Sequence, residues 1–162
     1  KELTDQTHMH ESIREFINLL ESKKFISYVE KITGVENLFI DNNLYGGGLN
    51  LYPAGSQLQT HIDFNFNNEI QAYRTVNLIY YLNDDFQEDS GGQFALYSSP
   101  QKLEKLIKPI LNTCLLFVTN KKTLHGVTKT SKNFFRKSIS IWYYTKEKQK
   151  NSDSEPHRTI WL

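Results

Sequence analysis

The sequence predicts one mainly β domain, a barrel or sandwich, with two helices packed on its outside. The first 34 residues carry two amphipathic stripes at helical spacing. From residue 38 onward, short runs rich in Val, Ile, Phe and Tyr alternate with Gly, Asn, Asp and Pro breaks. The 162 residues, 38% of them hydrophobic, suffice for one core, and no repeat or composition break marks a second domain. We therefore expect a single domain over residues 1–162, with helical support in 1–34, the β core in 38–145 and a polar tail in 146–162.

The helical part is expected to contain two helices. Residues 8–20 form an amphipathic pattern, and Ser22 can cap a second helix for which Gly34 suits the C-terminal stop. Both apolar stripes are interpreted as packing faces. Their members are Ile13, Phe16, Ile17 and Leu20 in the first helix, and Phe25, Ile26, Val29 and Ile32 in the second.

The β part is expected to begin near residue 38. Gly46, Gly47 and Gly48 indicate a bulge or bend, because strand-like residues flank them. Residues 100–109 carry a short amphipathic piece that is interpreted as one helical turn. The expected strands lie near 38–41, 44–52, 58–64, 73–82, 93–97, 112–118, 123–128 and 135–145.

Charge and composition exclude several classes of function. With 19 basic and 18 acidic residues, the net charge of +1 gives no electrostatic argument for binding nucleic acid or an anionic membrane surface. The pair Lys121 and Lys122 is interpreted as a solvated turn. No apolar run approaches the roughly 18 residues of a membrane span. The single cysteine, Cys114, excludes an intrachain disulfide and fits a reducing compartment, so a cytoplasmic location is expected.

The most informative motif is a set of three metal-ligating residue types. His61 and Asp63 are two positions apart, so on a strand their side chains point to the same face. His125, from a distant strand, would complete a two-histidine, one-carboxylate site. That ligand set leaves open positions on a non-haem Fe(II), where a co-substrate and O2 can bind.

An arginine near the end of the chain extends this interpretation. Arg136 begins a strand on which Ser138 and Ser140 share its face. A guanidinium can hold the far carboxylate of 2-oxoglutarate through two parallel hydrogen bonds. Either serine could add a hydroxyl donor, and Tyr80, in a neighbouring strand, could donate its phenol to the same carboxylate.

With these residues in view, the chain resembles the Fe(II)/2-oxoglutarate-dependent oxygenases of the prolyl 4-hydroxylase type. The resembling segments occur in the family's order and cover most of residues 50–145. They are Tyr52-Pro53, His61-Ile62-Asp63, Arg74 through Asn83, Gly91 through Phe94, Lys108-Pro109, His125-Gly126-Val127 and Arg136 through Tyr143.

The resemblance implies a double-stranded β-helix, the cupin-like jelly roll, with the N-terminal helices packed outside. It implies Fe(II) on His61, Asp63 and His125, with 2-oxoglutarate and O2 as co-substrates and ascorbate as a candidate reductant. It also implies contacts to 2-oxoglutarate from Arg136, Tyr80 and Tyr52, and a contact to substrate from Arg74 at the mouth of the site. The expected reaction hydroxylates an unactivated C–H bond, with a prolyl residue of a peptide or protein as the preferred substrate, and releases succinate and CO2.

Four alternatives stay open at this point. The same chemistry could act on a free amino acid, a sugar or another small metabolite. A jelly-roll module could bind a ligand without oxidising it, although the intact triad argues against this. A zinc hydrolase is disfavoured because His-Glu-x-x-His and His-x-His motifs are absent. A nucleic-acid demethylase is disfavoured by the near-neutral charge and by the lack of a second arginine after Arg136 on that strand.

Overall fold

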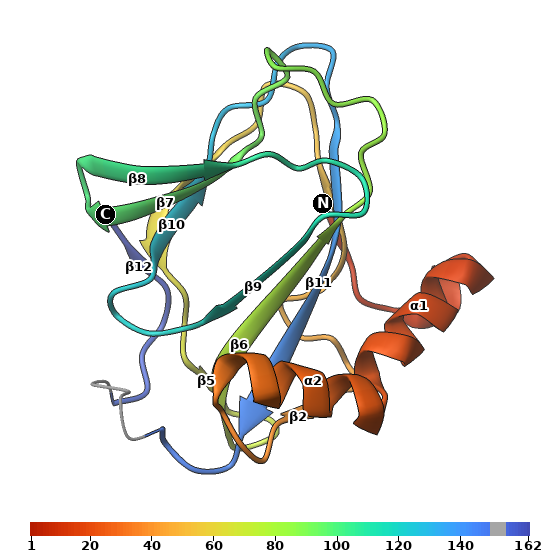
Figure 1. The fold of residues 1–162 in the computed structure, drawn as a ribbon, viewed down its shortest axis with the longest axis vertical. Coiled ribbons are helices and arrows are strands. Elements are labelled where there is room, and N and C mark those ends of the chain that lie inside the picture. The colour runs from red at the N-terminus through yellow and green to blue at the C-terminus, as the bar shows by residue number, and fades with distance from the viewer. Residues whose placement is uncertain (150–154) are drawn as a thin grey trace.

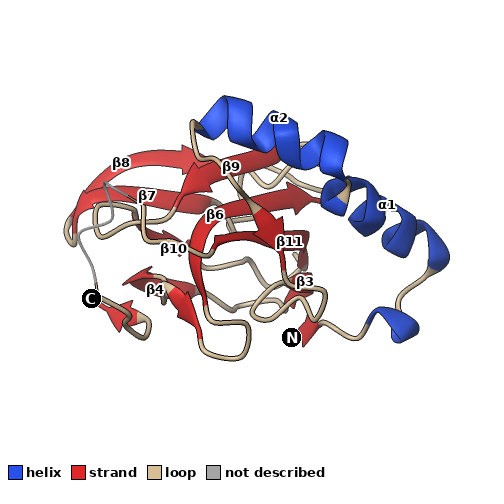
Figure 2. Cartoon of the chain, turned by 90° about the horizontal axis from the view of Figure 1, so that it is seen from below, coloured by secondary structure: helices blue, strands red, loops and turns tan. Residues whose placement is uncertain are grey.

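The computed structural model of the chain describes residues 1–149 and 155–162. Two antiparallel sheets face each other, and both helices lie on the outside of one of them (Figures 1 and 2). The seven-stranded sheet has the order β1-β3-β11-β6-β5, with β2 on β11 and β9 on β6. The five-stranded sheet has the order β12-β4-β10-β7-β8. This is the mainly β jelly roll with outer helices that the sequence predicts.

The elements follow one another along the chain with short connections. The helices are η1 (Gln6–His8), α1 (Glu11–Glu21) and α2 (Lys23–Thr33). The strands of the larger sheet are β1 (Glu2–Leu3), β2 (Phe39–Ile40), β3 (Gly48–Tyr52), β5 (Phe66–Asn67), β6 (Ala72–Tyr81), β9 (Cys114–Val118) and β11 (Arg136–Thr145). Those of the smaller sheet are β4 (Leu58–Ile62), β7 (Phe94–Ser99), β8 (Lys102–Ile107), β10 (Leu124–Val127) and β12 (Ile160–Trp161).

The two helices form where their capping residues predict. The hydroxyl of Ser22 accepts a hydrogen bond from the amide of Phe25 at 3.2 Å, and Gly34 ends α2 in the left-handed conformation. Figure 2 shows α1 and α2 lying along the outer face of the larger sheet, and their apolar stripes pack on β6 and β11. The cluster includes Ile17, Leu20 and Val29 from the helices and Val76, Leu78, Ile139 and Ile141 from the strands. Burial of this face leaves the opposite face of β6 and β11 free to line the space between the sheets.

The three glycines 46–48 form the predicted bend. Asp41 accepts hydrogen bonds from the amides of Asn43 and Tyr45, and this turn delays the start of β3 until Gly48. Gly46 has a φ of 68°, and a side chain there would collide with the guanidinium of Arg74. The bend therefore gives an arginine side chain room to lie against the backbone.

Two segments differ from the sequence-based expectation. Residues 102–107 form β8, which pairs with β7, and not a helical turn. The apolar spacing of Leu103 and Leu106 resembles a helix, but both side chains are largely exposed, and the pairing with β7 satisfies the backbone of this edge strand.

The end of the chain is the second difference. Ile160 and Trp161 form β12, which extends the five-stranded sheet by pairing with β4. Of the expected polar tail in 146–162, residues 150–154 lie outside the described residues.

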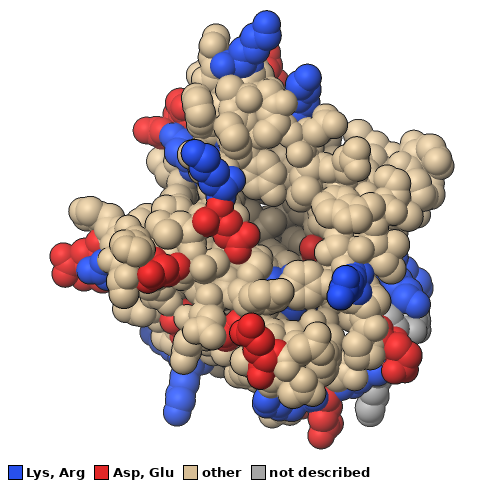
Figure 3. All heavy atoms as spheres, turned by 180° about the vertical axis from the view of Figure 1, so that it is seen from behind, with Lys and Arg blue, Asp and Glu red and all other residues tan. Residues whose placement is uncertain are grey.

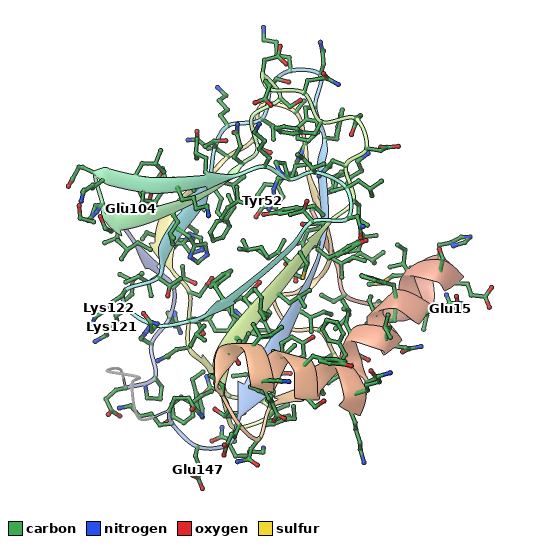
Figure 4. All side chains as sticks on the ribbon, in the orientation of Figure 1. Glu15, Tyr52, Glu104, Lys121, Lys122 and Glu147 are labelled. Atoms are coloured by element: carbon green, nitrogen blue, oxygen red, sulfur yellow. The ribbon has the colours of Figure 1, made fainter. Side chains whose placement is uncertain are left out.

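The outer surface agrees with the charge pattern of the sequence. Figure 4 shows Lys121 and Lys122 on the turn between β9 and β10, pointing away from the core. Figure 3 shows acidic and basic side chains interspersed on the rear face. Within residues 1–149 and 155–162, no helix has the length and apolar character that crossing a bilayer requires.

A buried asparagine fixes the start of β11. The amide of Asn83 donates to the carbonyls of Pro109 (2.7 Å) and Lys137 (3.1 Å), and its oxygen accepts from the amide of Lys137 at 2.7 Å. Its side chain is fully buried. Asn83 therefore ties the loop before β9 to the strand that carries Arg136.

We expect Asn83→Ala to lower the free energy of unfolding by about 2–4 kcal/mol, because it removes the side-chain partner of the Lys137 amide and of the Pro109 carbonyl. Urea denaturation followed by circular dichroism measures this change. The control is Asn68→Ala, which alters an exposed residue and should change stability by less than about 0.5 kcal/mol. Equal effects of the two substitutions would contradict the role of Asn83.

Candidate metal centre and co-substrate pocket

A bulge between β4 and β10 sets the position of the two histidines. His125 pairs with His61, whereas Val127 pairs with Leu58, so β4 contains one extra residue between these two pairs. A bulge of this kind bends the strand and re-aims its side chains. Gly126 lies opposite the bulge, where a β carbon would come within 2.8 Å of the carbonyl oxygen of Leu58. The sequence His-Gly-Val in β10 thus fits the bulge that brings His61 beside His125.

The three predicted ligands converge on one point. Nε2 of His61 lies 3.3 Å from Oδ1 of Asp63, and Nε2 of His125 lies 3.3 Å from Oδ2 of the same carboxylate. One ligand atom from each residue lies within 4.8 Å of the other two. Ligands in neighbouring positions around a first-row metal ion are about 3 Å apart. The spacing therefore fits a single ion.

Each imidazole is oriented by a backbone carbonyl. Nδ1 of His61 lies 2.8 Å from the carbonyl oxygen of Gln59, and Nδ1 of His125 lies 3.0 Å from that of Thr123. Because a carbonyl can only accept, each Nδ1 carries the proton. Nε2 of both rings is then the nitrogen available to a metal, and such partners also hold the rings in place.

The three groups perturb one another's ionisation. Burial alone would lower the pKa of His61, but hydrogen bonds with Asp63 and Gln59 outweigh it and raise this pKa. Burial lowers the pKa of His125, against the opposing charge of Asp63. The pKa of Asp63 is lowered: burial would raise it, but the hydrogen bond from His61 and the electrostatic interactions with His125, His61 and Arg74 prevail. The site thus favours the anionic form of Asp63.

The surroundings of the two histidines differ. The ring of Phe94 stacks on His125 at a centroid distance of 5.0 Å, and Phe117 meets the same imidazole edge-on at 5.3 Å. The ring of Trp161 packs on the His61 imidazole at a centroid distance of 5.0 Å, and this indole is 55% exposed. The cluster is therefore enclosed by apolar rings at His125 and more open at His61.

Arg136 lies on the inner face of the opposite sheet as a buried cation. It is 2% exposed, and its guanidinium carbon lies 4.9 Å from the ring centroids of both Tyr52 and Tyr81. Nη1 donates to the hydroxyl of Ser138 at 3.4 Å. Among the described residues no carboxylate forms an ion pair with Arg136. A buried charge is normally paired, so this arrangement indicates a place for an anionic ligand.

Unsatisfied polar atoms mark the same interior. In the described part of the chain, five buried side-chain atoms make no hydrogen bond. Four of them belong to residues that line the space between the sheets: Asp63 Oδ2, Asn77 Oδ1, Tyr81 Oη and Arg136 Nε. Figure 4 places Tyr52 in this space, and Figure 3 shows the rear face hollowed near its centre. Because buried polar groups are seldom left unpaired, the interior is suited to a polar occupant.

The prediction that Tyr80 faces Arg136 is wrong, and the neighbouring Tyr81 shares the face of Arg136. Tyr80 lies on the helix-covered face of β6, where its ring packs on Phe16 at 4.5 Å and its hydroxyl donates to Asn112. Tyr81 is paired with Ser138 and so shares the inner face with Arg136. Burial raises the pKa of Tyr81 against the opposing charge of Arg136, so its phenol is a hydrogen-bond donor.

The two serines predicted to assist Arg136 lie at different distances from it. Ser138 contacts Arg136, but Ser140 lies four residues from Arg136, about 13 Å along the strand. Ser140 is paired with Gly48 and Ile79 on the same inner face. The structure therefore places Ser138, and not Ser140, beside the guanidinium.

Arg74 adjoins the metal cluster but is held by its neighbours. Its guanidinium lies between the rings of Phe64, at 3.6 Å, and Trp142, at 3.8 Å. Nη2 donates to the carbonyl of Tyr45 at 2.7 Å. Burial lowers the pKa of Arg74, although the charge of Asp63 opposes this. A contact between Arg74 and a substrate stays a prediction.

Two cavities adjoin the cluster. One, of about 780 Å³, has Tyr45, Phe64, Phe66 and Trp161 in its lining, together with polar and charged residues. The other, of about 630 Å³, reaches Asp63 and Arg74 and is otherwise lined mainly by hydroxyl, amide and charged residues. His157 lines both cavities and lies near Asn65, whose side-chain oxygen accepts from the His157 amide at 2.8 Å.

Sequence reasoning missed Tyr81, Phe94, Phe117 and Trp161. For Tyr81 a signal was present, because alternation along β6 groups it with Thr75 and Asn77, the more polar face of the strand. The position of Trp161 depends on a pairing between β12 and β4 that no local pattern indicates.

Comparison with known proteins agrees with this geometry. The model of the 2OG-Fe(II) oxygenase superfamily matches residues 47–144, which contain the three candidate ligands and Arg136. A search of curated proteins found no match.

Several solved structures have a similar fold. A prolyl-4-hydroxylase from Pseudomonas putida superposes with a TM-score of 0.60 at 19% identity, covering 85% of this chain and 66% of that one. A viral collagen prolyl hydroxylase from Paramecium Bursaria Chlorella virus-1, solved with 2OG, gives 0.59 at 17% identity, with coverages of 85% and 75%.

A prolyl hydroxylase from Trichoplax adhaerens, solved with a peptide fragment of the hypoxia inducible factor oxygen degradation domain, gives a TM-score of 0.51 at 29% identity. The alignment covers 75% of this chain and 55% of that one, so the chain spans little more than half of that relative. The match of the family model to more than half of the chain shows its family. The chain belongs to the 2OG-Fe(II) oxygenase superfamily, whose cofactors are Fe(II) and 2-oxoglutarate.

Proposed function

We propose that this protein is an Fe(II)- and 2-oxoglutarate-dependent dioxygenase that hydroxylates a prolyl residue of a peptide or protein. In this proposal His61, Asp63 and His125 hold Fe(II), and Arg136 binds the far carboxylate of 2-oxoglutarate with help from Tyr81, Tyr52 and Ser138. The observation that carries the proposal is the convergence of a two-histidine, one-carboxylate cluster with an unpaired, buried arginine across the same interior.

The donor set fits Fe(II). Two neutral imidazole nitrogens and one carboxylate leave about three positions of an octahedral ion free for other ligands. The orientation of both Nδ1 atoms toward carbonyls supports Nε2 as the metal-binding atom in each ring. The carboxylate of Asp63 supplies a negative charge that offsets part of the charge of the ion.

The arginine pocket fits a dicarboxylate. Nε of Arg136 and the hydroxyl of Tyr81 are both buried donors without a partner among the described residues. A carboxylate could accept from both, and charge-assisted hydrogen bonds of this kind are strong. The Tyr52 ring forms another wall, and the hydroxyl of Ser138 already contacts the guanidinium.

When bound, Fe(II) and 2-oxoglutarate supply the oxidising chemistry: one O2 is consumed, its two oxygen atoms pass to succinate and to the product alcohol, and CO2 is released. The residues of the chain hold and orient the reactants. Phe94 and Phe117 exclude water from the His125 side, and the buried Arg136 fixes one end of the co-substrate.

The choice of a peptide substrate is supported by the larger cavity and by the comparisons. A volume of about 780 Å³ falls in the range of about 300–1,000 Å³ that binds ligands of several residues or of drug size. Aromatic-lined grooves are a common mode of recognising proline-containing segments. The Trichoplax relative was solved with a peptide fragment, which is consistent with the same choice here.

A small polar metabolite is the second candidate. The cavity of about 630 Å³ beside Asp63 is rich in hydroxyl and amide groups, which suit a free amino acid or a sugar. Mass spectrometry of candidate peptides and metabolites after aerobic incubation distinguishes the two by the molecule that gains one oxygen. The cytoplasmic location stays a prediction.

The direct test is succinate release. We expect the protein to convert 2-oxoglutarate to succinate in the presence of Fe(II) and O2, and Asp63→Ala to abolish this turnover because the ion loses its one anionic ligand. Asp89→Ala, which removes an exposed carboxylate, is the control and should retain full turnover. Full activity of Asp63→Ala would refute the ligand assignment, and an inactive natural sequence would favour a binding module.

A pair of adjacent tyrosines tests the co-substrate pocket. We expect Tyr81→Phe to raise the KM for 2-oxoglutarate by about tenfold, because a buried hydrogen bond to a charged group is lost. Tyr80→Phe should change this KM by less than about twofold, since its hydroxyl bonds to Asn112 on the other face. Succinate formation at varied 2-oxoglutarate measures both. The reverse order of effects would place the co-substrate elsewhere.

Metal affinity should depend on pH. His61 must lose its proton to bind a metal, and its pKa lies above the usual 6.5. Without metal, the ion pair between protonated His61 and Asp63 stabilises the folded protein at a pH below the usual pKa of histidine. This stabilisation is lost as the pH rises through the raised pKa of His61. The affinity for Mn²⁺ should therefore fall about tenfold per pH unit below the pKa of His61.

Thermal unfolding with and without Mn²⁺ measures this effect. The rise in Tm caused by the metal should be larger at pH 8 than at pH 6, and His8→Ala, which removes an exposed imidazole, should behave like the natural sequence. A metal-induced shift that is the same at both pH values would argue against histidine ligation.

A further inference from the structure

The C-terminal strand places an exposed indole beside a candidate metal ligand. In the register of β12 on β4, Trp161 is directly opposite His61, and His61 is in turn opposite His125. Directly opposed residues in antiparallel strands point to the same face. The three side chains therefore form one row on the inner face, and the indole is at the end of the row, 5.0 Å from the His61 ring.

The opposite end of this row is closed. His125 is packed between Phe94 and Phe117, and its side chain is only 8% exposed. At the His61 end, Trp161 is 55% exposed, although one side of its ring faces the imidazole. Among the described residues, Trp161 is thus an exposed ring that contacts the metal cluster, at its His61 end.

The exposed part of the indole faces the aromatic groove. The cavity of about 780 Å³ extends from Trp161 and Arg158 to Tyr45 and Phe64. Tyr45 is 48% exposed and meets Phe64 edge-on at 5.8 Å. Phe64 follows Asp63 directly and Trp161 packs on His61, so two rings of the groove each adjoin a candidate ligand. A peptide lying in the groove would therefore lie near the metal cluster.

We propose that Trp161 is a specificity-determining residue beside the metal site, with its exposed indole face packing on an apolar peptide residue next to the prolyl residue to be hydroxylated. This inference rests on the proposed function. A flat aromatic face binds an apolar ring by burying area with little loss of side-chain entropy. If Trp161 served only to cover His61, a buried ring would suffice, as Phe94 is for His125.

The neighbouring residue in β12 offers a matched control. Ile160 is paired with Ile62, so its side chain points to the opposite face of the sheet from Trp161. It is also partly exposed, at 36%. Ile160→Ala therefore perturbs the same two-residue strand without altering the row that contains His61.

The test measures peptide binding and metal binding separately. A fluorescently labelled decamer of proline is titrated, in the absence of O2, into protein loaded with Mn²⁺ and 2-oxoglutarate, and anisotropy gives the Kd. We expect Trp161→Ala to raise the peptide Kd by about tenfold. Trp161→Phe should retain most of the affinity, and Ile160→Ala should change it by less than about twofold. The Kd for Mn²⁺ alone, measured by calorimetry, should change by less than about twofold in all three variants.

The outcomes separate this inference from the function on which it rests. An unchanged peptide Kd in Trp161→Ala overturns the inference, as does a parallel loss of Mn²⁺ affinity, which would make the indole a support for His61. Turnover of 2-oxoglutarate without binding of the decamer also overturns it, while leaving the oxygenase assignment intact. Absence of any 2-oxoglutarate turnover in the natural sequence would instead refute the proposed function.

Discussion

The site depends on the register of β4 against β10. One extra residue in β4 shifts the pairing between Leu58 and His61, and the shift brings His61 opposite His125. The bulge also frees the Gln59 carbonyl to accept from Nδ1 of His61, so one backbone irregularity sets both the position and the orientation of the imidazole. A one-residue slip would turn these side chains to the other face of the sheet. Gly126 lies opposite the bulge because a β carbon there would collide with the Leu58 carbonyl.

In the larger sheet, successive side chains alternate between a face that packs against the helices and a face that lines the candidate site. On β6 and β11, one set of side chains packs beneath the helices, and the other set faces the interior with Asn77, Tyr81, Arg136 and Ser138. Both faces belong to the same two strands, so the apolar contacts with α1 and α2 also hold the interior polar groups in place. Asn83 extends this support, since it fixes the backbone at Lys137, next to Arg136.

The sequence was sufficient for the ligand set and the fold because these depend on local patterns and on motif order. His61, Asp63, His125 and Arg136 could be selected by residue type, spacing and family resemblance. The prediction chose Tyr80 over Tyr81 without using the alternation along β6, which groups Tyr81 with Thr75 and Asn77, and the pairing of Tyr81 with Ser138 agrees with that alternation. The strand β8 was missed because Leu103 and Leu106 are spaced as in a helix. Trp161 could not be foreseen, since its position follows from a pairing with β4 across 100 residues of chain.

Arg136 illustrates how a buried cation without a carboxylate partner can be accommodated in a folded protein. A buried guanidinium without a counter-ion is unfavourable, because desolvation is not offset by an ion pair. Here the faces of Tyr52 and Tyr81 each lie 4.9 Å from its central carbon, and a cation over an aromatic ring regains part of the lost hydration. The remaining deficit is concentrated in Nε of Arg136 and the Tyr81 hydroxyl, which point into the interior without partners. A ligand that satisfies both donors binds the native state alone, so its binding energy adds directly to the stability of the fold. The same unpaired groups would therefore favour a carboxylate as the ligand of the pocket.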